Sequence, residues 1–227
     1  MSLIELDDIT KIYHTGENEV RALGGITMRV ERGEFAAIIG QSGSGKSTLM
    51  NILGCLDVPD HGVYRLDGEN VLSLPDRALS GIRNRKIGFI FQGFNLVSSL
   101  DALENVELPL AYRGVPREQR GRMAAEALDM VGLSNRLRHR PGQLSGGQQQ
   151  RVAIARAIAA KPSILLADEP TGNLDSRAGA EVMQILHSLH KQGNTIVLIT
   201  HDPGIASGLD RQIVLGDGML LRDSAAS

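Results

Sequence analysis

Residues 35–53 read FAAIIGQSGSGKSTLMNIL: an apolar run, a glycine-rich turn, and a segment with helical character. The continuous apolar run 35–39 is typical of a strand that is buried on both faces of a parallel sheet. The segment 48–53 has the composition of a helix directly after that strand. A strand, a tight turn and a helix in succession are the setting that a glycine-rich phosphate loop requires.

The turn itself, residues 40–47, has the residue types of a nucleotide-binding loop. Its glycines let backbone N–H groups face a phosphate, and the helix start adds roughly half a positive charge. We expect Lys46 to reach the β- and γ-phosphates and Ser47 to ligate Mg²⁺. A chance glycine-rich turn is the alternative, but the pattern should arise by accident in well under about one such chain in a hundred. The expected nucleotide-binding residues here, called the phosphate loop, are Gly40, Gln41, Ser42, Gly43, Ser44, Gly45, Lys46, Ser47 and Thr48.

Two consecutive carboxylates, Asp168 and Glu169, follow the apolar run 164–167. Ligands of parallel sheets bind at the carboxyl ends of the strands, where this pair is expected to lie. Asp168 is suited to hold a hydrated Mg²⁺, and Glu169 to orient and deprotonate an attacking water. Such pairs also cap the following helix, but the phosphate loop in the same chain favours the catalytic interpretation.

A second glycine-containing loop, LSGGQ at residues 144–148, comes immediately before a helical stretch at 149–160. Ser145 can cap that helix while Gly146 and Gly147 expose its unpaired N–H groups. A plain N-cap is the alternative, although a plain cap needs no second glycine. Because the chain already has one γ-phosphate site, this second anion site is expected to serve the nucleotide of another copy.

Composition favours an α/β protein that works without nucleic acid. Of the 227 residues 42% are hydrophobic but only 3% are aromatic, which is typical of parallel sheets covered by helices. A net charge of −2 supplies no positive field for a polyanion. Cys55 is the only cysteine, so an intrachain disulfide is excluded. No apolar run approaches the roughly 18 residues of a membrane span, so we expect a cytoplasmic chain whose membrane role needs a partner.

The hydrophobic pattern divides the chain into recognisable parts that form one composite domain. The N-terminal part of the chain alternates apolar with polar residues, which predicts antiparallel strands with one solvent-exposed face. Later continuous apolar runs predict strands of a central, doubly covered sheet. About 70 residues with helical signals lie between two of these runs. The predicted elements are antiparallel strands at 3–13 and 26–30, buried strands at 35–39, 87–91, 164–167 and 196–199, helices after Pro116 and near Ser176, and a final strand 213–215 with a turn at 216–218.

The order of these segments resembles the nucleotide-binding subunit of an ATP-binding-cassette (ABC) transporter, and the resemblance covers essentially the whole chain. It implies a P-loop NTPase (RecA-like) core with a mainly parallel sheet, an N-terminal antiparallel β subdomain and an inserted α-helical subdomain. Core and β subdomain are expected at about 1–92 and 158–227, and the helical subdomain at about 93–157. The resemblance also implies that two copies pack head to tail, with each ATP between one phosphate loop and the partner's signature loop, which here is Leu144, Ser145, Gly146, Gly147 and Gln148.

Further family positions can be carried over to this chain. Gln92 resembles the glutamine that reaches Mg²⁺ and water, and His201 resembles the histidine that contacts the γ-phosphate. Asp175 resembles a residue of the loop that crosses to the partner, with helix capping as its alternative role. Tyr13 stands where the family places an aromatic ring against adenine, with a core or surface tyrosine as the alternative. The implied metal ligands are Ser47, Gln92 and Asp168, and the implied catalytic residues are Lys46, Gln92, Glu169 and His201.

Within the family, residues 88–92 (GFIFQ), 102–106 (ALENV) and 167–175 (ADEPTGNLD) resemble the macrolide-exporter and lipoprotein-releasing (MacB and LolD) group. This implies an ATPase that needs ATP and Mg²⁺, forms a homodimer, and works at the inner face of the cell membrane through a separately encoded permease. One alternative is a regulatory ABC ATPase that signals through a membrane partner without transport. Another is a soluble ABC ATPase acting on nucleic acid or ribosomes, for which the chain lacks a basic excess and a second cassette.

Overall fold

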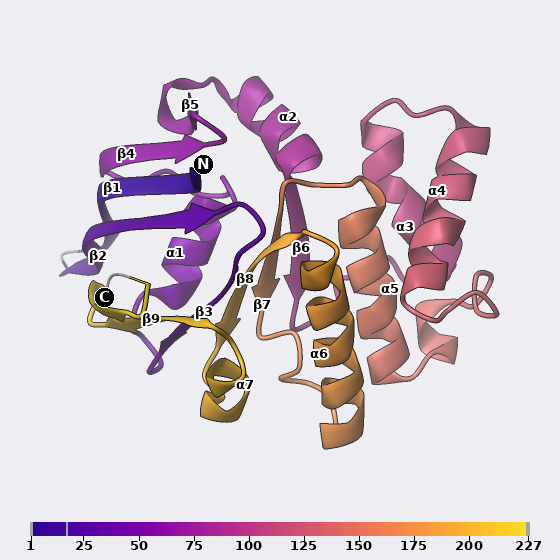
Figure 1. Ribbon diagram of the computed structural model, residues 1–227. Helices are drawn as coiled ribbons and strands as arrows, with labels where there is room; N and C mark the ends of the chain where they lie inside the picture. The colour runs from indigo at the N-terminus through magenta and orange to yellow at the C-terminus, as the bar shows by residue number, and fades with distance from the viewer. Residues whose placement is uncertain (1, 17, 226–227) are drawn as a thin grey trace. The chain divides into compact units, whose positions relative to one another are not determined.

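The computed structural model describes residues 2–16 and 18–225, which form two compact units (Figure 1). One unit is Met1–Gly81 with Gly193–Ser227, and the other is Ile82–Gln192. Both mix strands with helices, which confirms the predicted α/β class. The finer division into subdomains at about 1–92, 93–157 and 158–227 stays a prediction.

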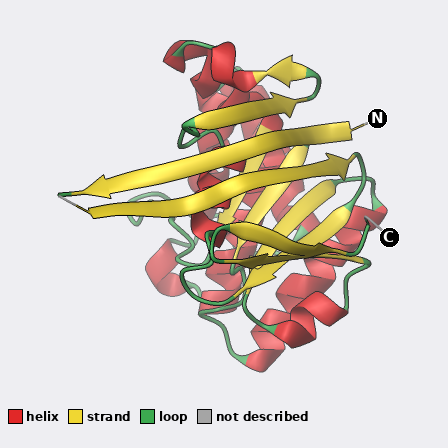
Figure 2. Ribbon diagram, turned by 90° about the vertical axis from the view of Figure 1, so that its left-hand side faces the viewer, coloured by secondary structure: helices red, strands yellow, loops and turns green. Residues whose placement is uncertain are grey.

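The first unit contains an antiparallel sheet with the strand order β2-β1-β4-β5. Strands β1 (Ser2–Thr15) and β2 (Asn18–Glu31) form a long hairpin whose strands run side by side along their length (Figure 2). Strand β4 (His61–Leu66) pairs with β1 on the other side, and the short β5 (Glu69–Asn70) pairs with β4. The C-terminal half of β2 alternates buried with exposed residues. The prediction of an antiparallel sheet with one solvent-exposed face is therefore confirmed.

The other strands of the first unit follow the order β10-β9-β3-β8. Strands β3 (Phe35–Gly40), β8 (Thr195–Thr200) and β9 (Arg211–Gly216) are parallel, and β10 (Met219–Asp223) is antiparallel to β9. All six residues of β8 are buried, as the continuous apolar run predicted. Asp217 and Gly218 connect β9 to β10 with φ values of 47° and 73°. Two positive φ angles in succession are what a type I′ hairpin turn requires.

Among the described residues of the first unit, three α-helices and one short 3₁₀ helix begin. Helix α1 (Lys46–Leu53) begins within the phosphate loop, and α7 (Pro203–Ser207) follows β8. The 3₁₀ helix Val71–Ser73 precedes α2 (Asp76–Lys86). Neither β4 nor α2 was among the predicted elements, because the residues of β4 follow no clear alternation and α2 buries few apolar side chains, notably Leu79 and Ile82.

In the second unit, β6 (Ile87–Phe91) pairs in parallel with β7 (Ile164–Asp168), and both lie where buried strands were predicted. Helices α3 (Ala102–Tyr112), α4 (Arg117–Met130) and α5 (Gly146–Ala159) pack against one another, and α5 also contacts α6 (Ser176–Lys191). A 3₁₀ helix, Pro141–Gln143, precedes α5. The helical segment between β6 and β7 is thus the inserted helical region that the sequence predicted.

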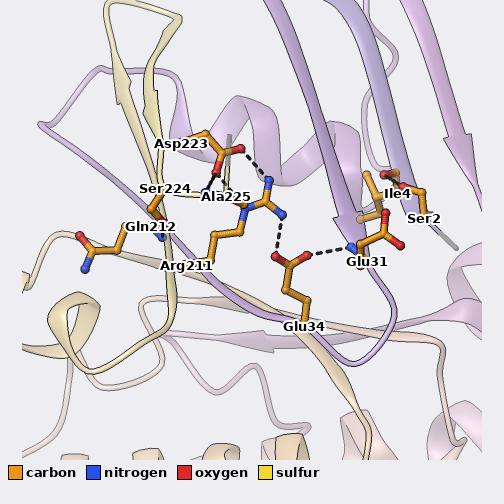
Figure 3. A network of polar contacts seen from close by, with 9 residues as sticks. All are labelled: Ser2, Ile4, Glu31, Glu34, Arg211, Gln212, Asp223, Ser224 and Ala225. Carbon is orange, nitrogen blue, oxygen red and sulfur yellow. Dashed lines mark hydrogen bonds and ion pairs between the residues drawn. The ribbon is translucent and has the colours of Figure 1, made fainter. Parts of the chain in front are cut away.

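Within the first unit, a buried ion-pair network joins β10 to β9 and to the residue before β3 (Figure 3). Arg211 is 7% exposed, and its guanidinium donates to Asp223 Oδ1 and Oδ2 at 2.9 and 2.6 Å and to Glu34 Oε1 at 2.8 Å. The second Glu34 oxygen accepts from Glu31 N at 2.7 Å. The hydrogen bonds to Asp223 raise the pKa of Arg211 against the opposing effect of burial. Burial raises the pKa of Asp223, but its bonds from Arg211 and a backbone N–H outweigh burial and lower it.

The helices of the described residues 2–16 and 18–225 include none that is long and apolar enough to cross a lipid bilayer.

Candidate nucleotide-binding site

The phosphate loop connects β3 to α1 through backbone conformations that favour glycine. Gly43 and Gly45 have φ values of 80° and 97°, and Gly45 is the N-cap of α1. Ser44 N donates to Gln41 O at 3.1 Å and closes the turn. The residues at 41–43 and Ser47 are exposed, while Thr48 is half-buried. The loop therefore presents its outer backbone and the Ser47 hydroxyl to solvent at the start of a helix, as an anion site requires.

Lys46 lies inside the loop rather than extending into solvent. It is 8% exposed, and its Nζ donates to Gly40 O at 2.8 Å, to Gln41 O at 2.7 Å and to Ser44 Oγ at 3.4 Å. These three oxygens match the three donors of an ammonium group. They are neutral acceptors, so an anionic phosphate oxygen would form stronger, charge-assisted bonds with the same ammonium.

The turn between β9 and β10 forms a hydrogen bond with the phosphate loop and so supports its conformation. Gly218 N donates to Ser44 O at 3.2 Å, and Gly218 O accepts from Gly24 N at 2.8 Å. A Cβ atom on Gly45 would lie 2.6 Å from Ala22 O, and one on Gly218 would lie 2.7 Å from the same oxygen. These glycines are therefore required by close backbone packing against β2, and the sequence alone gave no sign of this contact.

Tyr13 and His201 are the other expected site residues of the first unit. Tyr13 lies near the end of β1, is 36% exposed, and donates from its hydroxyl to Asp57 Oδ2 at 2.6 Å. His201 is exposed and directly follows β8. The next residue, Asp202, caps α7 by accepting from Gly204 N at 2.7 Å. Asp57 is a partner of Tyr13 that sequence reasoning missed.

The acidic pair lies at the carboxyl end of β7, as predicted. Asp168 is the last residue of the strand and pairs with Phe91, the last residue of β6. Glu169 has a φ of 43°, a left-handed conformation that turns the chain sharply out of the strand. Its carbonyl oxygen accepts from Gly172 N at 3.0 Å. Non-glycine residues adopt this conformation rarely and often at functional sites.

Gln92 continues directly from β6 and contacts the turn that follows the acidic pair. Its Nε2 donates to Asn173 Oδ1 at 3.3 Å, and Asn173 Nδ2 donates to Gln92 O at 3.1 Å. A Cβ on Gly172 would lie 2.5 Å from Gln92 Nε2, so a larger residue there would displace the Gln92 side chain from its present position. The sequence placed Asn173 in the loop before Asp175 but assigned it no contact.

The donor set predicted for magnesium is a hydroxyl, an amide oxygen and a carboxylate, from Ser47, Gln92 and Asp168. All are hard oxygen donors, which suit Mg²⁺ when phosphates and water complete its octahedron. Within the part of the chain that the structure describes, no group of three or more His, Cys, Asp and Glu side chains could hold a metal by itself. The donor types of Ser47, Gln92 and Asp168 therefore fit Mg²⁺ whose remaining ligands are phosphate oxygens and water.

Asp175 caps helix α6, which is the alternative role named for it above. Its Oδ1 accepts from Ala178 N at 2.9 Å, and its side chain is exposed. The cap satisfies an unpaired donor of the first helical turn. A role toward a partner copy stays a prediction.

The signature loop forms the capped start of α5. Ser145 Oγ accepts from Gln148 N at 3.3 Å, and Gln148 Oε1 accepts from Ser145 N at 3.0 Å, so the two residues form a capping box. The helix begins at Gly146, three residues before the predicted start at 149, because this reciprocal pair satisfies the N-terminal donors there. Ser145 itself is exposed.

The second glycine of the signature loop has a structural reason that the sequence argument did not consider. A Cβ on Gly147 would lie 2.9 Å from the Cβ of Ala178 in α6. The expectation that a plain cap needs no second glycine is therefore wrong here, because close packing of α5 on α6 also demands one. This packing leaves the proposed anion-binding role of the loop untested.

The expected residues thus fall into two sets, one in each compact unit. Each set is ordered by its own hydrogen bonds and tight glycine contacts. The first unit holds Tyr13, the phosphate loop 40–48 and His201, and the second holds Gln92, the signature loop 144–148, Asp168, Glu169 and Asp175.

Known proteins are similar to this chain along nearly its whole length. A Thermotoga maritima protein described as an uncharacterized ABC transporter ATP-binding protein is 56% identical over 200 residues, covering 88% of this chain and 86% of the relative. The macrolide export ATP-binding/permease protein MacB of Hyphomonas neptunium is 51% identical over 222 residues, covering 98% of this chain and 34% of that protein. The chain therefore spans about a third of the length of its MacB relatives.

Solved structures show the same fold. The dimeric post-hydrolysis state of the ATP-binding cassette MJ0796, bound to ADP and Pi, is 47% identical, with a TM-score of 0.88 over 97% of both chains. A second dimeric structure of MJ0796, described as a bacterial ABC transporter cassette, is 48% identical with the same TM-score. The sequence profile of the family described as ABC transporter matches residues 23–172. The phosphate loop, the signature loop and the acidic end of β7 all lie inside that match. The chain therefore belongs to the ABC transporter family as an ATP-binding cassette.

Proposed function

We propose that this cassette binds ATP with Mg²⁺, closes on a second copy of itself, hydrolyses the nucleotide and thereby drives a membrane permease of the MacB and LolD type. The observation that carries the proposal is the conformation of Lys46. Its ammonium is buried at the centre of a loop whose outer backbone is exposed at a helix start. A charge held in this way favours a phosphate group at the mouth of the loop.

Each catalytic residue has a role that its local geometry supports. The phosphate loop 40–48 would bind the phosphates, and Lys46 would neutralise charge on the β- and γ-phosphates. Glu169, turned out of the end of β7, would accept a proton from the attacking water. Gln92 and His201, each directly after a strand, would orient that water and contact the γ-phosphate.

Mg²⁺, when bound, would neutralise charge on the phosphate oxygens. Ser47, Gln92 and Asp168 are the residues proposed to hold it. Tyr13 would stack on the adenine ring.

The signature loop is proposed to act on the nucleotide of the partner copy. Ser145 is exposed although it caps α5, and Gly146 and Gly147 at the start of the helix are partly exposed, so this helix start is accessible within this chain. A negatively charged γ-phosphate is a suitable ligand for such a helix start. The dimeric MJ0796 structures support the proposal that this cassette also pairs with a second copy.

Replacement of the proposed base tests the function directly. We expect Glu169→Gln to bind ATP normally, to accumulate as a dimer in ATP and Mg²⁺, and to lose at least about 100-fold in turnover, within the usual range for a general base. Sedimentation velocity and phosphate release measure the two effects. Near-normal turnover would remove Glu169 from this role, and a monomer that binds ATP would contradict the shared site.

A signature-loop variant separates the two halves of the proposal. Ser145→Arg places a bulky cation at the exposed start of α5 and should leave ATP binding by the isolated monomer within about twofold. Dimer formation and turnover should both be lost, because the proposed partner site is blocked. Ser134→Arg, a change of the same residue type in an exposed loop of the same unit, is the matched control. An unaffected rate in Ser145→Arg would refute the shared nucleotide site.

The permease is proposed to bind the helical region of the second unit. An open groove of about 660 Å³ lies along α3 and α4, lined by both leucines and charged residues. Protein interaction sites combine apolar and polar contacts in this way. Its lining includes Leu100, Leu103, Leu108, Glu104, Glu107 and Arg120. Leu103→Glu should abolish co-purification with a permease from detergent-solubilised membranes and leave basal ATP hydrolysis unchanged.

Co-purification also decides between the proposal and its alternatives. A permease that moves substrate in vesicles only with ATP supports transport. A membrane partner without transport supports a regulatory ATPase, and recovery of ribosomes or DNA instead supports the soluble class.

A further inference from the structure

The side chains of Lys11 and Asp57 form a polar cluster that contacts Tyr13. Asp57 uses both of its oxygens: Oδ2 accepts from the Tyr13 hydroxyl at 2.6 Å, and Oδ1 accepts from Lys11 Nζ at 2.9 Å. Lys11 Nζ also donates to Val58 O at 2.7 Å. Three residues from two separate segments of the chain therefore fix the position of one exposed aromatic ring.

Lys11 contacts the ring as well as its partner carboxylate. Its Nζ lies over the Tyr13 ring at 5.2 Å from the centroid, within the range of a cation–π interaction. The Lys11 side chain is only 13% exposed, whereas Tyr13 is 36% exposed. Lys11 thus lies over the ring, while Tyr13 as a whole residue remains exposed to solvent.

The same cluster is attached to the helix that follows the phosphate loop. Asp57 N donates to Asn51 O in α1 at 3.2 Å, and Leu56 N donates to the same oxygen at 2.8 Å. Through Asp57, the ring is therefore linked to the last turn of the helix whose first residues belong to the phosphate loop.

The charges of the cluster support a persistent arrangement at neutral pH. Burial raises the pKa of Asp57, but its hydrogen bonds from Lys11, Tyr13 and Val58 N outweigh burial and lower it. Burial lowers the pKa of Lys11, and the bond to Asp57 more than compensates and raises it. Burial and the bond to Asp57 raise the pKa of Tyr13, so the phenol remains a donor.

We propose that Lys11 and Asp57 are positioning residues that hold Tyr13 as a platform for the nucleotide base, at a distance set by α1 from the phosphate loop. This inference rests on the proposed function, since it concerns the base of the nucleotide that the phosphate loop binds. A ring held in advance costs less conformational entropy on binding than a free one. The cluster should therefore contribute to affinity for a nucleoside triphosphate but not for a triphosphate that has no base.

The test compares ATP with inorganic tripolyphosphate as competitors for a ribose-labelled fluorescent ATP analogue, measured by anisotropy on the intact chain. Asp57→Asn, Lys11→Met and Tyr13→Phe should each weaken ATP binding about three- to tenfold, the range expected for one aromatic stacking contact. Tripolyphosphate binding should stay within about twofold of the original protein. Asp7→Asn, an exposed carboxylate on the same strand, is the matched control.

Two further comparisons distinguish positioning from a general effect on the fold. Lys11→Arg keeps a cation near the ring and should restore most of the ATP affinity lost in Lys11→Met. The Tyr13→Phe and Asp57→Asn double variant should be no weaker than the worse single variant, because both changes break the same bond. The KM for ATP should rise in these variants while kcat is retained.

The possible outcomes separate this inference from the proposed function. If the unaltered chain binds neither ATP nor tripolyphosphate, the proposed function itself fails. If the chain binds both, and Asp57→Asn or Lys11→Met weakens both equally or neither, the positioning role is overturned. If Asp57→Asn fails to fold, the positioning role is tested with three other variants: Lys11→Met, Lys11→Arg and Tyr13→Phe. The quantity compared is again the affinity for ATP divided by the affinity for tripolyphosphate.

Discussion

Gln92 and Asn173 are joined by two reciprocal hydrogen bonds, from Gln92 Nε2 to Asn173 Oδ1 at 3.3 Å and from Asn173 Nδ2 to Gln92 O at 3.1 Å. One residue follows β6 and the other lies in the turn after β7. The pair therefore connects the loop that leads into the helical region with the turn that carries Glu169. A displacement of either segment must break these bonds or move the other segment.

Asn173→Ala should uncouple the two loops without removing any group assigned to the chemistry. We expect kcat for ATP to fall about three- to tenfold, because one or two neutral hydrogen bonds of about 1 kcal/mol each no longer fix Gln92. ATP affinity should change by less than about twofold. Asn135→Ala, at an exposed position of the same unit, serves as the control in steady-state kinetics. Equal kcat values in the two variants would show that the link is dispensable.

Gly147→Ala separates packing from anion binding in the signature loop. The added methyl would lie 2.9 Å from the Cβ of Ala178, so we expect a loss of about 1–3 kcal/mol in the free energy of unfolding. Ala178→Gly in the same chain removes the opposing methyl and should recover most of that loss in a urea titration. If turnover returns together with stability, Gly147 is needed only for packing. Persisting loss of turnover in the stable double variant would support its proposed contact with the partner's nucleotide.

Gly218→Ala tests the support of the phosphate loop against a closely matched control. Gly218 and Gly68 each follow an aspartate in a turn and have φ values of 73° and 78°. A Cβ on Gly218 would lie 2.7 Å from Ala22 O, but one on Gly68 would meet nothing within 4 Å. Gly68→Ala should cost about 1 kcal/mol of stability and leave ATP binding unchanged. Gly218→Ala should cost more and weaken tripolyphosphate binding by at least about threefold, and equal binding in both would contradict the proposed support.

Asp223→Asn should destabilise the first unit in a pH-dependent way. At pH 7 we expect a loss of about 2 kcal/mol in the free energy of unfolding, because the buried Arg211 loses one of its two ionised partners and keeps only Glu34. The folded state lowers the pKa of Asp223 below its ordinary value of 3.8. Its stabilising effect is therefore complete at pH values above that ordinary value, and it disappears as the pH falls through the lowered folded-state pKa.

Chemical unfolding at pH 7, 5 and 3 measures this dependence. The difference between Asp223→Asn and the original chain should be the same at pH 7 and 5 and smaller at pH 3. Asp210→Asn changes an exposed carboxylate just before β9 and should show no difference at any of these values. A constant difference down to pH 3 would show that the carboxylate charge is not what stabilises β10.

The sequence predicted the parts of the fold whose signals are local. Strands β3, β6, β7 and β8 are continuous apolar runs, and the Asp217–Gly218 turn carries the residues that its backbone conformation demands. Helix α2 was missed because its eleven residues contain few apolar side chains and four basic ones. Strand β4 was missed because its six residues, HGVYRL, follow no clear alternation.

The candidate site was predictable at the level of motifs but not of their supports. Glycine, lysine and carboxylate patterns are contiguous in the sequence, so the phosphate loop and the end of β7 could be found directly. Asp57 binds a tyrosine 44 residues away, and Gln92 binds an asparagine 81 residues away. No local pattern encodes either pair, because only the folded backbone brings the partners together.

The environment of Tyr13 also gives the protein a built-in optical reporter. The chain has no tryptophan and only three tyrosines, so its ultraviolet emission comes from Tyr13, Tyr64 and Tyr112 alone. Tyr64 is 1% exposed with its hydroxyl bonded to Leu53 O, whereas Tyr112 is 83% exposed at the end of α3. Replacing Tyr112 with phenylalanine would leave two fluorescent residues, the buried Tyr64 and Tyr13, and a stacked base would quench the emission of Tyr13. Binding of the base to Tyr13 could then be followed in unlabelled protein.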